Sequence, residues 1–560
     1  MKEKLDKTSK RIWGVFLVIC FCIGIGMTFG YNEKNTGENK ENRLPEYTQD
    51  TSYVTAAHYF ADEWPINFWN AEWDNLENDL EQIKSDGFNT VIFVVPWREF
   101  QPDIERMTYN DKALERLDYL LAKVDKAGLW AKVRLGYLND YYGEGDTAAR
   151  FYAIVGSKKV QKAWFEYAQT IYSVCIDHEC FKGGFITWED FWHNYALIDY
   201  VGGTELGIEM ASDAGFQDYV ENIYGIEQFN VLFKQNFGSC KDIYVPQREH
   251  LYAGEWYSYI DQFTLNLLKE SRKYFPGLSM EVRTDTDNVA TLNGKKADHI
   301  ITWDCAGGRY TAIMYKPDQG IVNGGSQLSS KEAVKYLEMW LKNILSNNSQ
   351  TPIFMEQFLF ADNTPGFENT NKIKENQLND YLLSVDKVLY ENTMGYGVWV
   401  YKDYKTNMIY NPQFALGLDG WSGENVEIVE VNGSAKARLH GGSFLSQNVP
   451  SIRRFSEGGA PLLEMDVINI SKTPVTLKVE IGEQNYELEI EEDKNYSISL
   501  PEQIFGNLKI YSQGEILIDN IRYYTHRQRG YLYDCNGKED MCIWAIRELN
   551  RKLFEWSYST

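Results

Sequence analysis

FNTVIFVV at residues 88–95 and LWAKVRLGY at residues 129–137 are two β-type runs, and DKALERLDYLLAKVDKA lies between them at residues 111–127. The leucines of the middle segment recur at helical spacing, and Gly128 follows its end, where helices commonly stop. The flanking runs are mostly apolar, which predicts strands that are buried on both faces. A strand, a helix and a second strand of this kind form one repeat of a parallel sheet.

The same repeat continues along the chain in both directions. Further predicted strands lie at 53–60, 183–189, 278–285, 299–305, 351–358 and 395–404, and further helices at 72–86, 158–178, 250–275, 329–347 and 372–392. The connection at 286–298 is too short for a full helix. Eight strands, most of them followed by a helix, predict an α/β fold, a (β/α)8 TIM barrel, over residues 53–407. A doubly wound open sheet is the alternative, but no glycine-rich phosphate loop follows any strand.

Beyond residue 407 the helical periodicity gives way to alternating runs such as LLEMDVINI and VTLKVEIG. They predict an antiparallel β-sandwich, jelly-roll-like, over residues 408–525. The final segment, 526–560, contains a predicted helix at 539–556, and the sequence does not indicate what this helix packs against.

The N-terminus resembles a membrane-targeting segment. Five Lys or Arg residues lie within the first 12 positions, and residues 13–30 carry no charge over a length sufficient to cross a bilayer. We therefore expect residues 1–30 to be a signal anchor, with a cleaved signal peptide as the alternative, and 31–52 to be a polar linker. Either way, the rest of the chain is expected outside the cell, as a single-pass membrane protein or in secreted form.

The composition limits the classes of molecule that the chain is expected to bind. The formal net charge of −24 opposes binding to nucleic acid, and the aromatic content of 15% favours carbohydrate, because aromatic rings stack on sugar faces. The cysteine spacing fits no zinc site. The pairs Cys175/Cys180 and Cys535/Cys542 are compatible with disulfides in an oxidising compartment and equally with free thiols.

In a parallel barrel, the residues at the C-terminal ends of the strands converge on one face, and that face carries the active site. Glu189 ends the fourth predicted strand and Glu356 the seventh, so their carboxyl groups are expected to face each other across a sugar. The complete set of predicted strand-end residues is His58, Trp97, Arg134, Glu189, Arg283, Asp304, Glu356 and Trp399.

A pair of carboxyl groups about 5–5.5 Å apart is what a retaining glycosidase requires. Glu189 is expected to donate a proton, with apolar packing by Trp188 favouring its protonated form, and Glu356 to attack the anomeric carbon as an ionised group beside Arg134. The structural alternatives are a helix cap for Glu189 and a buried ion pair for Glu356. Sugar contact is expected for a set of side chains around the two glutamates: His58, Trp97, Arg134, Trp188, Asn194, Asp304 and Trp399. Packing at a strand end is the alternative for His58, Trp97 and Trp399, and pairing with a loop acid is the alternative for Arg134.

The segment from Val95 to Gly136 resembles the second-to-third-strand region of clan A retaining glycoside hydrolases, such as β-galactosidases, cellulases and mannanases. The likeness lies in the Trp97…Gln101-Pro102 turn, the following helix and the entry into the third strand, and the layout extends over about 350 residues. It implies that Glu189 is the acid/base, that Glu356 is the nucleophile and that Trp399 forms the floor of the sugar site. The clan has Asn before the acid/base, where this chain has Trp188; Asn194 is the candidate to replace it.

The region after residue 408 resembles the carbohydrate-binding jelly rolls that are often appended to glycosidases. The resemblance lies in NPQFALGLDGW at 411–421, in SFLSQNV and in ILIDNIRYY at 516–524. In those modules an Asp-Asn pair helps to bind a structural calcium, so Asp519 is the candidate ligand, although Ala415 stands where an acidic residue is usual. A purely structural β-domain is the alternative to a sugar binder.

The sequence thus predicts an extracellular retaining glycoside hydrolase that acts on an oligo- or polysaccharide and needs no metal or organic cofactor for the chemistry. A non-catalytic glycan-binding or exopolysaccharide-assembly protein on a degenerate barrel is the alternative, motivated by Trp188. A third alternative is transglycosylation on the same carboxylates.

Overall fold

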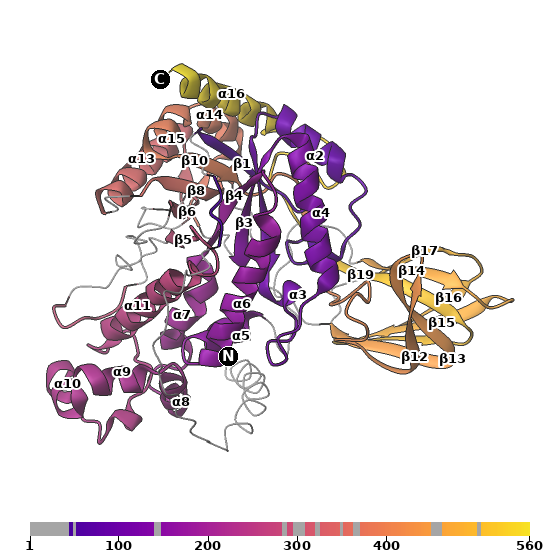
Figure 1. Ribbon diagram of the computed structural model, residues 1–560, viewed down its shortest axis with the longest axis horizontal. Helices are drawn as coiled ribbons and strands as arrows, with labels where there is room; N and C mark the ends of the chain where they lie inside the picture. Colours follow the sequence, from indigo (N-terminus) through magenta and orange to yellow (C-terminus); the bar gives the residue numbers. More distant parts are fainter. Residues whose placement is uncertain are drawn as a thin grey trace, which may run out of the picture.

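A computed structural model describes residues 44–48, 52–138, 147–282, 288–294, 309–317, 319, 325–347, 351–361, 370–449, 462–500 and 506–559. Its larger part is a closed barrel of eight parallel strands, which confirms the predicted barrel (Figure 1). The barrel strands are β1 (Val54–His58), β2 (Thr90–Pro96), β3 (Trp130–Gly136), β4 (Phe181–Ile186), β5 (Ser279–Val282), β6 (Thr311–Tyr315), β8 (Ile353–Phe358) and β10 (Gly395–Val398).

The sixth strand of the barrel differs from the predicted one. The run HIITWDC at 299–305 lies outside the described residues, and β6 occupies the place between β5 and β8. Tyr310 and Ala312 join the apolar cluster in the barrel interior, where they pack with Phe354. Two short apolar runs of similar appearance occur in this stretch, and the pairing register with the neighbouring strands decides between them.

Capping residues and apolar faces determine where the helices around the barrel begin, end and pack. Helix α4 (Asp111–Ala127) begins at Asn110, whose side chain accepts a hydrogen bond from the amide of Ala113, and ends at Gly128 with a left-handed φ of 67°. Further helices between consecutive barrel strands include α2 (Leu76–Ser85), α3 (Trp97–Phe100), α5 (Thr147–Ile154), α6 (Lys158–Cys175), α11 (Ala253–Ser271), α13 (Ser330–Asn347), α14 (Leu378–Leu382) and α15 (Asp386–Asn392). The helix predicted at 372–392 is therefore divided into separate pieces.

The last helix, α16 (Ile543–Ser559), returns to the barrel (Figure 1). It packs against α14 and α15, and Asn550 accepts a hydrogen bond from the Tyr396 hydroxyl of β10 and donates to the carbonyl of Asp86 just before β2. In a (β/α)8 barrel this is the position of the helix that follows the eighth strand. The helix predicted in the final segment thus completes the ring of helices.

Between β10 and α16 the chain forms a second unit, an antiparallel sheet. All nine strands among the described residues belong to one hydrogen-bonded antiparallel sheet, which confirms the predicted antiparallel β-domain. Its own core includes Leu439, Leu463, Leu477 and Ile518. The strands are β11 (Tyr404–Asn407), β12 (Ser422–Val431), β13 (Ser434–Val449), β14 (Leu462–Asn469), β15 (Val475–Ile481), β16 (Gln484–Ile490), β17 (Lys494–Ser499), β18 (Gly506–Ser512) and β19 (Ile516–Gln528).

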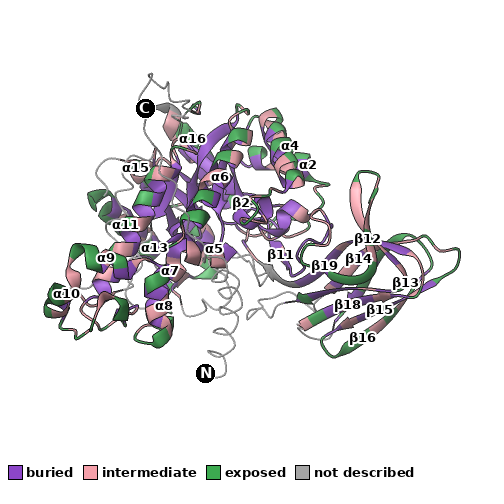
Figure 2. Ribbon diagram, turned by 60° about the horizontal axis from the view of Figure 1, so that its bottom comes forward, coloured by how far each residue is buried: buried purple, intermediate pink, exposed green. Residues whose placement is uncertain are grey.

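After β4 a helical insertion precedes α11. It contains η2 (Trp188–Phe191), α7 (Trp192–Tyr200), α8 (Glu205–Asp213), α9 (Phe216–Ile223) and α10 (Gly225–Phe233). Its helices α9 and α10 show many exposed residues in Figure 2.

Two expectations concern the rest of the chain. The anchor at 1–30 and most of the linker at 31–52 lie outside the described residues; within the described ranges, no helix combines the length and the apolar character that a membrane span requires. Cys175, Cys180, Cys240, Cys535 and Cys542 are free thiols, so the two proposed disulfides are absent among these residues.

Candidate active site

Arg134 lies at the centre of the polar cluster at the C-terminal ends of the strands. This β3 residue is 1% exposed. Its Nη2 donates to the Thr187 hydroxyl at 3.0 Å and to Oε2 of Glu189 at 3.1 Å. The Glu189 side chain, which follows β4, is 33% exposed, so it is the solvent-accessible end of this pair.

Glu356 on β8 pairs with His58 at the end of β1. Both side chains have no exposed surface, and Nε2 of His58 lies 3.2 Å from Oε2 of Glu356 and 2.7 Å from its backbone carbonyl oxygen. Because a carbonyl only accepts, Nε2 carries the proton and donates. Burial lowers the pKa of His58 to about 3. The hydrogen bond that His58 donates to the Glu356 carbonyl opposes this lowering, and the charge of Arg134 adds to it. His58 is therefore neutral at ordinary pH.

The two pairs belong to one electrostatic cluster. Although burial lowers the pKa of Arg134, the negative charges of Asp190, Glu189 and Glu356 raise it well above its usual value. One guanidinium thus neutralises carboxylates from two strands that are distant in the barrel. Arg134 was expected beside Glu356, whereas its direct ion pair is with Glu189.

Asp190 holds the start of the helical insertion in place. Its carboxylate, fully buried, accepts hydrogen bonds from the Leu138 amide at 3.0 Å and the Thr187 hydroxyl at 2.9 Å. Burial raises the pKa of Asp190 to about 6, and Arg134 opposes this rise. Asp190 therefore fixes the turn after β4, on which Glu189 is carried.

Aromatic side chains line the same face. Trp399, after β10, is 8% exposed and lies 4.9 Å from the His58 ring and 5.4 Å from the Phe60 ring. Trp64 packs against Tyr137 at 5.7 Å, and the Arg134 guanidinium lies 4.9 Å from the centre of the Tyr137 ring. Phe60, Trp64 and Tyr137 were not singled out from the sequence, although they follow β1 and β3 within a few residues.

Three predicted contact residues are used for packing instead. Trp97, fully buried, donates to the Gln101 side chain at 2.7 Å and packs against Trp164. Asn194, 2% exposed, donates to the carbonyl of Phe151, so it does not replace the missing asparagine. Trp188, also fully buried, stacks on Tyr195 at 5.1 Å. Asp304 and Arg283 lie outside the described residues.

The described residues contain no group of three or more His, Cys, Asp or Glu residues that could hold a metal ion. In the sheet unit, the Asp519 carboxylate lies 2.7 Å from the Lys436 ammonium and accepts a hydrogen bond from Ser434 at 3.1 Å. An ammonium group therefore occupies the neighbourhood of the predicted calcium ligand.

Comparisons with known proteins give structural likenesses only. No protein-family profile and no curated protein matches the sequence. Similar solved structures include a variant of a GH5_18 protein from Streptomyces cattleya in complex with Manb1-4GlcNAc, with 13% identity and a TM-score of 0.40, covering 63% of this chain and 72% of that chain. An exo-beta-1,4-mannosidase from Opitutaceae bacterium strain TAV5 has 14% identity and a TM-score of 0.39, covering 64% of this chain and 54% of that chain.

Proposed function

We propose that this chain is a retaining glycoside hydrolase that acts on an oligo- or polysaccharide through Glu189 and Glu356. The observation that carries the proposal is the shared guanidinium of Arg134, whose charge is balanced by both glutamates from opposite parts of the barrel. A retaining glycosidase requires two carboxyl groups, one on each side of the bond that it cleaves.

In the proposed reaction a carboxylate oxygen of Glu356 attacks the anomeric carbon, and the bond to the leaving oxygen breaks as Glu189 gives that oxygen its proton. Water then attacks the glycosyl-enzyme bond, Glu189 accepts the proton of the water, and Glu356 is released as a carboxylate. The neutral His58 donates to Glu356 and keeps its carboxylate oriented. Trp399 and Trp64 provide apolar faces for sugar rings.

The expected location also belongs to this proposal. The uncharged stretch at 13–30 would hold the catalytic unit outside the cell, attached by a single span or released by cleavage. The antiparallel sheet unit would then be an accessory domain, either for glycan binding or for structure alone.

A second candidate function is glycan binding without turnover. It is favoured by the burial of Glu356, which has no exposed surface, and by the ion pair that keeps Glu189 as a carboxylate partner of Arg134. An acid catalyst has to be protonated, so hydrolysis requires this pair to open when substrate binds.

Hydrolysis of nitrophenyl glycosides and of a panel of glycans by the purified chain distinguishes the two candidates. Glu356→Gln is expected to abolish turnover, and Glu189→Gln to reduce it by roughly 10²–10⁴-fold on glycans but far less on dinitrophenyl glycosides, whose leaving group needs no proton. Glu548→Gln on α16, distant from the site, is the control. Sugar affinity with no turnover in any variant would establish the binding protein instead, and products longer than the donor would indicate transglycosylation.

A further inference from the structure

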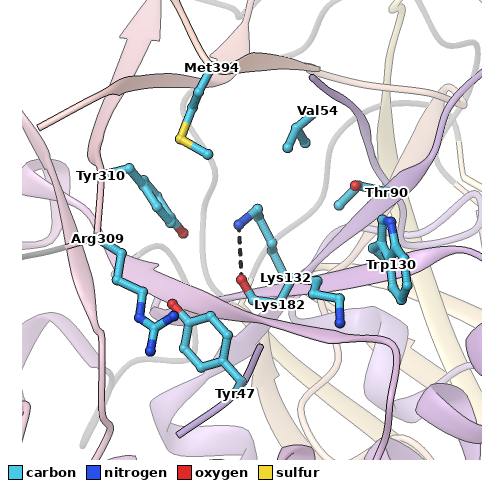
Figure 3. Close-up of a pocket in the computed structure, with 9 residues that line it drawn as sticks. All are labelled: Tyr47, Val54, Thr90, Trp130, Lys132, Lys182, Arg309, Tyr310 and Met394. Carbon is cyan, nitrogen blue, oxygen red and sulfur yellow. Dashed lines mark hydrogen bonds between the residues drawn. The ribbon is translucent and has the colours of Figure 1, made fainter. Parts of the chain in front are cut away.

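A loop at residues 59–64 follows β1 on the barrel face that carries the two glutamates. Its last residue, Trp64, is partly exposed and lies 5.7 Å from the Tyr137 ring, which the Arg134 guanidinium contacts. At the opposite end of the barrel, where the strands begin, described side chains surround a cavity of about 10 Å³ (Figure 3). That cavity holds no more than a water-sized particle. A sugar ring does not fit there, whereas Trp64 lies beside the candidate site.

The sheet unit holds this loop through its backbone. The Trp64 amide donates to the carbonyl of Lys405 at 2.9 Å, and the Lys405 amide donates to the carbonyl of Asp62 at 2.8 Å. Lys405 belongs to β11, and an isolated parallel bridge pairs it with Glu63. The Trp64 ring also lies 5.2 Å from the ring of Tyr404, the first residue of β11. Strand β11 therefore positions both the backbone and the indole of Trp64.

A buried carboxyl group makes the second connection between the loop and the sheet unit. Glu63 is 6% exposed, and its Oε1 accepts a hydrogen bond from the Tyr524 hydroxyl of β19 at 2.6 Å. Three charged groups face this carboxyl: Asp62 on the same loop, Lys405 on β11 and Arg522 on β19. The Lys405 ammonium pairs with Asp62 at 3.1 Å. Glu63 thus lies inside the contact, and its ionisation acts on that contact.

The charge of Glu63 changes near neutral pH. Burial raises the pKa of Glu63 from 4.5 to about 7; the Tyr524 hydrogen bond and the charges of Lys405 and Arg522 oppose this rise, and Asp62 adds to it. The docked loop therefore binds the proton of Glu63 more tightly than a loop released into water does. Docking is strongest below about pH 4.5 and weakens as the pH rises to about 7.

We propose that the sheet unit forms one wall of the sugar-binding site by positioning Trp64, and that Glu63 and Tyr524 are the side chains that dock the loop. Trp64 is the residue that contacts the sugar. Glu63 and Tyr524 are positioning residues, because both are buried between the loop and β19. The sugar contact of Trp64 rests on the proposed function, whereas the docking of the loop does not.

Amide hydrogen exchange of the full chain, measured by mass spectrometry, tests the docking without any substrate. Tyr524→Phe removes the hydrogen bond to Glu63 and is expected to speed exchange in the peptide that contains the Trp64 amide by roughly 10-fold. Tyr496→Phe is the matched control, since its hydroxyl donates to the Glu492 carbonyl within the sheet unit, and it is expected to leave this peptide unchanged. Equal exchange in Tyr524→Phe and the unsubstituted chain would overturn the proposal.

The pH dependence of the same peptide is a readout that general destabilisation does not reproduce. After correction for intrinsic exchange, the protection of the Trp64 amide is expected to fall by roughly 10–100-fold between pH 5 and pH 8. Glu63→Gln keeps an acceptor for Tyr524 and has no proton to lose, so its protection is expected to stay constant. A peptide from α4 reports effects on the whole fold. The same fall in Glu63→Gln as in the unsubstituted chain would contradict the proposal.

Steady-state kinetics test the link to the sugar site, with the glycan that the unsubstituted chain hydrolyses fastest as the probe. Tyr524→Phe is expected to raise KM by roughly 3–10-fold and to leave kcat within about twofold, because it changes only the position of Trp64. Trp64→Ala is expected to raise KM at least as much, and Tyr524→Phe added to it is expected to have no further effect. Additive effects would overturn the proposal. A chain that hydrolyses no glycan contradicts the proposed function alone, and the exchange measurements then decide whether the loop is docked as proposed.

Discussion

Arg134 determines the charge balance of the candidate site. It is a fully buried cation whose neighbours include three carboxylates, two of which, on Asp190 and Glu356, have no exposed surface. We predict that Arg134→Met lowers the free energy of unfolding by about 3–5 kcal/mol, because it leaves buried carboxylates without their cation. Chemical denaturation measures the loss. Arg134→Lys keeps the charge but not the contact to Thr187, so it is expected to retain part of the stability that Arg134→Met loses. An equal loss of unfolding free energy in both variants would argue against a charge effect.

His58 predicts a specific pH dependence of stability. Its pKa is about 3 in the folded chain and close to 6.5 when unfolded, so between these values the unfolded state binds more protons. The contribution of His58 is complete above pH 6.5 and is lost towards pH 3, at about 1.4 kcal/mol per pH unit. The free energy of unfolding is measured by urea denaturation at pH 7 and at pH 5. Between these two values we expect the decrease to be about 2 kcal/mol smaller for His58→Gln than for the unsubstituted chain. An equal decrease in the two chains would contradict a neutral, buried His58.

The rule that strand ends converge was sufficient to select Glu189, Glu356, His58, Arg134 and Trp399. It failed for Trp97 because the backbone turns into a short helix directly after β2, which directs the indole towards Trp164 and away from the barrel axis. It also said nothing about which carboxylate Arg134 contacts. That choice depends on the turn after β4, which is fixed by buried hydrogen bonds to Asp190 that have no signature in the sequence.

At the level of single elements, one buried carboxylate joins α16 and the segment before it to the barrel. Asp86, at the end of α2, accepts hydrogen bonds from the Tyr401 hydroxyl at 2.6 Å, the Tyr533 hydroxyl at 2.9 Å and Nε of Arg547 at 2.7 Å. Tyr401 comes two residues after Trp399, so the cluster also anchors the segment that carries this part of the candidate site.

We predict that Asp86→Ala destabilises the chain by about 3–5 kcal/mol, because three donors lose their common acceptor. Glu548→Ala, which removes an exposed partner of Arg551, should cost no more than about 1 kcal/mol. Both are measured by chemical denaturation. A loss at Asp86 no larger than that at Glu548 would show that the Asp86 carboxylate does not help to hold α16 on the barrel.

The elements were predictable where local signals were complete. Helix α4 has a capping asparagine, a regular leucine face and a terminal glycine, and its predicted bounds are the observed ones. Strand β6 lacked such signals, because its length and composition are no more strand-like than those of neighbouring runs and its place is set by pairing with β5 and β8. The partner of α16 was also beyond prediction, since it lies more than 100 residues away in the chain.

For the whole molecule, the sheet unit is an insertion between the eighth strand and the eighth helix of the barrel. Its two ends are direct antiparallel partners, with Tyr404 opposite Gln528 and Lys405 opposite Arg527. We predict that joining Lys405 to Arg527 through Asn-Gly, a sequence suited to a two-residue hairpin, yields a soluble barrel that unfolds in one transition. Calorimetry and gel filtration test this.

The matched control is a chain that ends at residue 407 and so lacks both the sheet unit and α16. It is expected to aggregate, because the apolar surface that α16 covers becomes exposed. If both shortened chains behave alike, the sheet unit contributes to the folding of the barrel and is not a separable insertion.

The return of α16 also governs how the protein responds to mechanical force. Tension applied between residues 44 and 559 acts first on the barrel and on the contacts of α16, because both points of attachment lie on the barrel side. The sheet unit carries no load until α16 detaches, and from then on β11 and β19 are pulled apart one hydrogen-bonded pair after another, a geometry that yields at low force.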